Sequence, residues 1–83
     1  MAEKEIGQVT RYFSRIGVAG IKLTDTLCEG DTIHIVGHTT DFTQEVRSME
    51  LENEPITKGQ PGQEIGLKVH ERVRLNDRVY KVE

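Results

Sequence analysis

One turn pattern occurs twice in this sequence, as Leu27-Cys28-Glu29-Gly30-Asp31-Thr32-Ile33 and as Val73-Arg74-Leu75-Asn76-Asp77-Arg78-Val79. Each copy has an apolar anchor, then Gly or Asn, then Asp, and an apolar residue two positions after the Asp. Gly and Asn tolerate positive φ with the least strain, and the Asp that follows can hydrogen-bond the turn backbone. We therefore expect positive φ at Gly30 and Asn76, with Asp31 and Asp77 holding turns that lead into strands.

Short apolar segments surround these turns, and several of them alternate apolar and polar residues with a period of two, which is typical of half-buried strands. Pro61-Gly62 adds a type II turn, in which Pro sets φ at the second position and Gly takes positive φ at the third. The sequence thus predicts an all-β fold, a small, closed, six-stranded, Greek-key-like β-barrel. Its expected strands are Ile6–Phe13, Ile16–Leu23, Thr32–Gly37, Phe42–Glu52, Glu64–Val69 and Arg78–Val82.

The fourth of these segments is ambiguous. Val46 and Ser48 are in phase, but Met49 and Leu51 are apolar one residue out of phase, which indicates a β-bulge near Ser48. A helix over Gln44–Asn53 is the alternative, although its next turn offers Asn53 instead of an apolar residue. The strand interpretation gives this expected core: Val9, Ala19, Ile21, Leu23, Leu27, Ile33, Ile35, Val46, Met49, Ile65, Leu67 and Val79.

Length and composition favour one β domain. Ile and Val number 15 against 5 Leu and 2 Ala among 83 residues, and β-branched side chains favour sheet over helix. We expect a disordered tail over residues 1–5 and a single domain over 6–83. The charged start MAEKEIG argues against a secretory signal, the single Cys28 cannot form an intrachain disulfide, and no apolar stretch is long enough to span a membrane. A cytoplasmic location follows as the simplest expectation.

The order and spacing of these turns and strands resemble domain II of translational GTPases of the elongation factor Tu and initiation factor 2 type. The resemblance is carried by Ile16-Gly17-Val18-Ala19, Leu27-x-x-Gly30-Asp31-x-Ile33-x-Ile35-x-Gly37, Val46-x-Ser48-Met49, Pro61-Gly62-x-x-Ile65-Gly66-Leu67 and Val79-Tyr80. It implies a stand-alone, elongation-factor-like barrel that contacts tRNA or the ribosome. A similar barrel is expected at the C-terminus of collagenase-type peptidases linked to RNA modification. No phosphate-binding G-x-x-x-x-G-K-[ST] loop is present, so GTP binding is not implied.

Catalytic and metal-binding patterns are weak. His34 and His38 are four residues apart, but on a strand that leads into a loop this spacing does not place both side chains on one face. Cys28 has no evident base partner, and Glu50, Glu52 and Glu54 fit a solvated strand face better than an acid/base pair. We therefore expect no enzyme activity, no cofactor and no metal.

Two segments are candidates for binding. In the first, Arg11, Tyr12, Phe13 and Arg15 combine two cations with two aromatic rings, which suits RNA phosphates and bases. A ring that plugs the barrel end beside solubilising arginines explains the same residues.

The second segment is the loop His38-Thr39-Thr40, which offers an imidazole and hydroxyls but also has ordinary turn composition. The resulting prediction is a noncatalytic module that contacts RNA, the ribosome or tRNA. The net charge of -3 favours the alternative, a protein–protein interaction adaptor or detached subunit of a separate enzyme.

Overall fold

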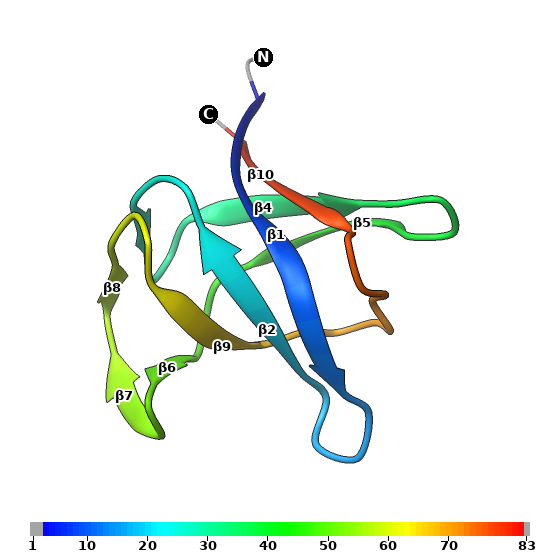
Figure 1. The fold of residues 1–83 in the computed structure, drawn as a ribbon. Coiled ribbons are helices and arrows are strands. Elements are labelled where there is room, and N and C mark those ends of the chain that lie inside the picture. Colours follow the sequence, from blue (N-terminus) through cyan, green and yellow to red (C-terminus); the bar gives the residue numbers. More distant parts are fainter. Residues whose placement is uncertain (1–2, 83) are drawn as a thin grey trace.

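The computed structural model describes residues 3–82 and is all-β in this range, as expected (Figure 1). No helix in these residues is long and apolar enough to cross a membrane. The strands are β1 (Glu3–Phe13), β2 (Val18–Leu23), β3 (Leu27–Cys28), β4 (Thr32–Val36), β5 (Asp41–Glu45), β6 (Met49–Leu51), β7 (Glu54–Ile56), β8 (Lys58–Gly59), β9 (Glu64–Lys68) and β10 (Arg78–Val82).

Eight of these strands form one curled antiparallel sheet in the order β5-β4-β10-β1-β2-β9-β6-β7, and β3 pairs with β8 separately. The expected closed six-stranded barrel is therefore wrong, because the two outer strands, β5 and β7, do not pair with each other. The pairing of β5 with β4 ends at Glu45. Val46 instead exchanges backbone hydrogen bonds with the turn, donating to Asp31 O and accepting from Gly30 N, both at 2.8 Å.

Because the pairing with β4 ends at Glu45, the expected strand Phe42–Glu52 is divided into β5 and β6. Residues 46–48 lie outside both strands, and this irregular segment, in place of a bulge within one strand, brings Val46 and Met49 into the core together. The helical alternative over Gln44–Asn53 is wrong. A two-residue hairpin then joins β6 to β7, with positive φ at both Glu52 (53°) and Asn53 (68°).

The repeated turn has the predicted geometry in both copies. Gly30 has φ 94° and Asn76 has φ 74°. Oδ2 of Asp31 accepts from the Cys28 amide at 2.8 Å, and Oδ2 of Asp77 accepts from the Arg74 amide at 2.9 Å. Gly62 has φ 89°, as expected for the third position of a type II turn.

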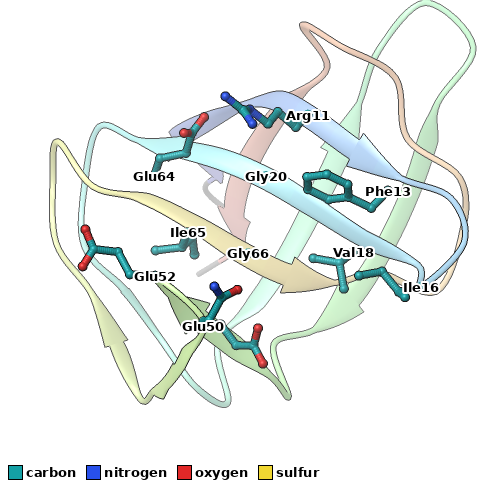
Figure 2. Close-up of a pocket in the computed structure, with 11 residues that line it drawn as sticks. Arg11, Phe13, Ile16, Val18, Gly20, Glu50, Glu52, Glu64, Ile65 and Gly66 are labelled. Atoms are coloured by element: carbon teal, nitrogen blue, oxygen red, sulfur yellow. The ribbon is translucent and has the colours of Figure 1, made fainter.

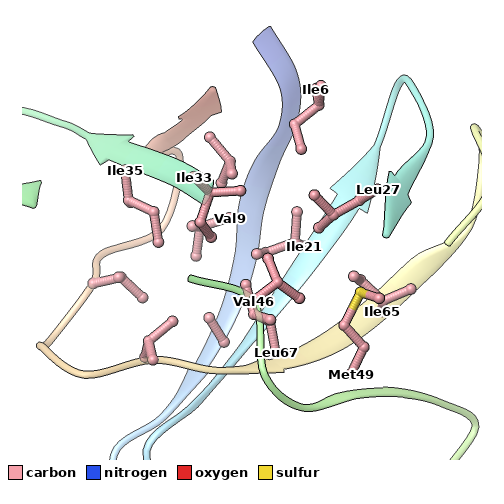
Figure 3. Packing of buried hydrophobic residues seen from close by; sticks show 14 of the residues in the cluster. Ile6, Val9, Ile21, Leu27, Ile33, Ile35, Val46, Met49, Ile65 and Leu67 are labelled. Carbon is pink, nitrogen blue, oxygen red and sulfur yellow. The ribbon is translucent and has the colours of Figure 1, made fainter. Parts of the chain in front are cut away.

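All twelve expected core residues are buried in one cluster (Figure 3). The sequence interpretation missed Ile6, Phe42, Val69 and Val73, which are also buried. Ile6 lies where the register of β1 against β10 shifts between Glu5 and Gly7. Val73 is the apolar anchor of the second turn and is as buried as its counterpart Leu27.

The expected tail over residues 1–5 also needs correction. Met1 and Ala2 lie outside the described residues, but residues 3–5 belong to β1 and pair with residues 80–82 of β10. Their polar side chains gain partners there: Lys4 pairs with Asp25 at 2.5 Å, and Glu5 accepts from Arg78 at 3.0 Å. Backbone pairing with β10, which needs no apolar side chain, orders this segment.

Candidate functional site

The outer face of the sheet has a row of four residues in register across β1, β2, β9 and β6. Arg11 pairs with Gly20, Gly20 with Gly66, and Gly66 with Glu50. Both glycines lack a side chain, and Gly66 is half-buried, whereas Gly20 is buried beside Arg11. The side chains around this pair of glycines line an open groove of about 520 Å³ (Figure 2), within the volume range of small-ligand sites, about 300 to 1,000 Å³.

Apolar side chains gather at the hairpin end of the groove. Phe13, Ile16 and Val18 lie there, with Phe13 47% and Ile16 56% exposed. The hairpin is held in place by β9 and the residue after it. Lys68 Nζ donates to Ile16 O at 3.0 Å, and Gly17, at φ 67°, accepts from the amide of Val69 at 2.9 Å. An exposed apolar surface is thus presented on a fixed backbone.

Carboxylates gather around the rest of the groove. Glu50 extends from β6, Glu52 from the β6–β7 hairpin, and Glu64 from β9 (Figure 2). Glu64 accepts a hydrogen bond from the hydroxyl of Thr10 in β1. Among residues 3–82, three carboxylates therefore share the groove with a single cation, Arg11.

The structure separates the two segments predicted to bind. Arg11 and Phe13 line the groove, whereas Tyr12 packs against the core and Arg15 is exposed in the turn. Of the two rings in this segment, Tyr12 is thus the one that packs against the core. The residues 38–40 lie in the turn between β4 and β5, which projects from a different side of the sheet (Figure 1). Thr40 is buried there, and its carbonyl accepts from the amide of Gly37 at 2.7 Å.

His34 has a structural environment that the sequence did not indicate. Its Nδ1 lies 3.0 Å from a Glu3 oxygen and its Nε2 lies 2.5 Å from Asp41 Oδ1. These hydrogen bonds, first to Asp41 and then to Glu3, raise the pKa of His34 above 6.5. The three side chains join β1, β4 and β5. In the described part of the chain, no group of His, Cys, Asp or Glu is arranged to hold a metal ion.

Sequence and structure comparisons identify proteins similar to this chain. An uncharacterised protease of Methanocaldococcus jannaschii is 39% identical over 77 residues, which are 92% of this chain and 19% of that protein. A collagenase of Porphyromonas gingivalis is 37% identical over 78 residues, 92% of this chain and 22% of the collagenase. The chain thus spans about a fifth of the length of these curated relatives. No family model matches it.

The crystal structure of the C-terminal domain of a putative U32 peptidase from Geobacillus thermoleovorans superposes with a TM-score of 0.90, at 20% identity over 96% of this chain and 93% of that one. This chain has the fold of that domain. Together with the protease and collagenase matches, the superposition supports the expected similarity to a barrel of collagenase-type peptidases.

The same comparisons overturn the main functional prediction. The chain is homologous to segments of peptidases, and these matches do not support an identity with domain II of translational GTPases, so the interpretation as a stand-alone, RNA-contacting translation-factor module is wrong. The turn and strand order that suggested it is a property of the fold, which unrelated functions can share. The alternative, a module or detached subunit that works with a separate enzyme, fits the findings better.

Proposed function

We propose that this chain is a noncatalytic accessory module of a collagenase-type peptidase, acting through protein–protein contact with a separate peptidase body. The observation that carries the proposal is the match of 92% of the chain to about a fifth of two proteases. The other four fifths of each relative are large enough to hold a catalytic domain. This chain, which matches the remaining fifth, has a hydrophobic core of its own.

The geometry supports contact rather than catalysis. A nucleophile needs a base within hydrogen-bond reach, at about 2.6 to 3.2 Å. Both ring nitrogens of His34 are engaged by carboxylates, so this imidazole has no free nitrogen with which to activate a nucleophile. By contrast, Phe13 and Ile16 are exposed on a backbone fixed by hydrogen bonds, which is the character of a protein-contact surface. The lone Cys28 supports a reducing cytoplasm as the proposed location.

An association experiment tests this function. The M. jannaschii relative is expressed without the 77-residue segment that matches this chain, and the purified chain is added to it. We expect a complex on gel filtration with light scattering, and no complex with the intact relative, whose own segment occupies the contact. The excised segment of the relative is the positive control. If that segment binds the truncated protein and this chain does not, the proposal fails.

A further inference from the structure

We propose that the groove over Gly20 and Gly66 binds an extended polypeptide segment of the partner that carries an apolar side chain beside Lys or Arg. The inference rests on the proposed function, because it names the surface through which the module contacts its partner. It is carried by three features of the groove: its open floor, its exposed apolar end and its excess of carboxylates.

The floor at Gly66 is open although the fold does not require glycine there. Its φ is not in the left-handed region, and a Cβ at this position would meet Val18 Cγ1 at 3.4 Å and Glu50 O at 3.9 Å, both ordinary contacts. Gly7 and Gly59 differ, since a Cβ at either would come within 2.8 Å of a neighbour. Glycine within a strand interior weakens the strand and often marks a close approach by a ligand or another backbone. At Gly66, therefore, glycine keeps open the space that an occupant would use.

The apolar end provides an anchor for one side chain of the occupant. Phe13 and Ile16 are two of the three exposed large apolar residues in residues 3–82, and both line this groove. Burying an exposed aromatic side chain in a contact is a common source of binding energy at protein interfaces. The occupant therefore presents an apolar side chain to this end.

The charge of the groove favours a basic residue in the bound segment. Glu50, Glu52 and Glu64 outnumber Arg11 in the groove, and no ion pair among the described residues neutralises Glu50 or Glu52. A Lys or Arg of a partner gains from these carboxylates, whereas a phosphate backbone is repelled by them. A polypeptide is thus favoured over a nucleic acid.

The dimensions fit an extended segment. The row from Arg11 to Glu50 crosses three strand-to-strand spacings, or about 14 Å at about 4.8 Å each. An extended polypeptide covers that distance in about four residues. About four residues of an extended occupant therefore cover the row between Arg11 and Glu50.

Synthetic peptides test the inference directly. One set carries Phe or Leu beside Lys, and a matched set carries Glu in place of Lys. Titrations are followed by the amide NMR signals of the isotope-labelled full chain. We expect the Lys peptides to shift the amide signals of Gly20 and Gly66 and the Glu peptides to leave them unchanged. Absence of binding by the Lys peptides, or equal binding by the Glu peptides, overturns the inference, as does binding of a poly-uridine RNA in the same groove.

Groove variants with matched controls locate the contact. Gly66→Leu fills the floor and Glu50→Lys reverses a groove charge, and each should weaken Lys-peptide binding by about tenfold or more, the effect of losing one interface anchor. Thr43→Leu and Glu71→Lys make the same kinds of change at exposed positions outside the groove and should bind as wild type. Circular dichroism checks that each variant is folded. Wild-type affinity in both folded groove variants contradicts the proposal.

The truncated protease separates failure of this inference from failure of the proposed function. If that protein binds wild type and Gly66→Leu equally, the module docks through another surface and only the groove assignment is wrong. If the Lys peptides bind in the groove but the protease body binds neither form, the peptidase partnership is wrong and the groove assignment stands.

Discussion

Gly37→Ala should destabilise the protein far more than the same change at Gly66, a glycine within β9. A Cβ at Gly37 would lie 1.8 Å from Oδ1 and 2.5 Å from Cγ of Asp77, a carboxylate that is only 4% exposed. Asp77 would have to move and release the Arg74 amide, which its Oδ2 now holds at 2.9 Å. Losing a hydrogen bond to a charged group costs about 1.5 to 3 kcal/mol, and overpacking adds about 1 to 3 kcal/mol.

We therefore expect a loss of about 2.5 to 6 kcal/mol in the free energy of unfolding, which is a large share of the stability of a domain of this size. Gly66→Ala is the matched control, because its added methyl makes contacts of 3.4 Å or longer, and it should cost less than about 1 kcal/mol. Urea unfolding followed by circular dichroism gives both values.

A double-mutant cycle tests the stated cause. In an Asp77→Ala background the carboxylate that clashes is gone, so adding Gly37→Ala should cost much less than it does in wild type. Equal losses for Gly37→Ala and Gly66→Ala would refute this reasoning, and so would strict additivity in the cycle.

Three further predictions concern the core, the repeated turn and pH. Ile33→Ala should lower the free energy of unfolding by about 2 to 5 kcal/mol, because Ile33 is fully buried, and a loss below about 1 kcal/mol would contradict its place in the core. Gly30→Val should cost about 1 to 3 kcal/mol through strain at φ 94°, whereas Glu29→Val should stay within about 0.5 kcal/mol of wild type by the same urea assay. Because folding raises the pKa of His34, its stabilising effect is fully present below 6.5 and is lost as pH rises through the raised pKa. Wild type should therefore exceed His34→Gln in stability most at pH values below 6.5 and least at pH values above the raised pKa. A stability difference that grows with pH would reverse that assignment.

Local chemistry made the turns predictable from the sequence. Gly30 and Asn76 each precede an Asp, and both the positive φ and the side-chain hydrogen bond follow from interactions within a few residues. The Glu52-Asn53 hairpin was missed because Glu is an unusual residue at positive φ. There the pairing of β6 with β7 imposes a conformation that the residue itself does not favour.

Both the closure of the sheet and the formation of the groove depend on contacts between residues that are distant in the sequence. Whether β5 meets another strand after Glu45 is decided by the bonds of Val46 with the Gly30–Asp31 turn, which no local pattern reveals. Gly20 and Gly66 are 46 positions apart in sequence and become neighbours only through the register of β2 against β9. The only sign of them in the sequence was a glycine within a strand pattern. Such a glycine often marks the close approach of a ligand or another backbone, but it does not identify which of these approaches.

The central place of β1 gives the domain a mechanical weakness. β1 lies between β10 and β2, and its first described residue, Glu3, pairs with Val82 at the far end of β10 (Figure 1). A force that pulls these two ends apart acts on the hydrogen bonds between β1 and β10 one after another, starting at Glu3 and Val82. The bonds therefore break in sequence and do not share the force. Once the ladder has parted, β4 and β5 remain with β10 while β2, β9, β6 and β7 remain with β1. Pulling at this point therefore splits the sheet in two, whereas a covering partner that bridges both halves would resist it.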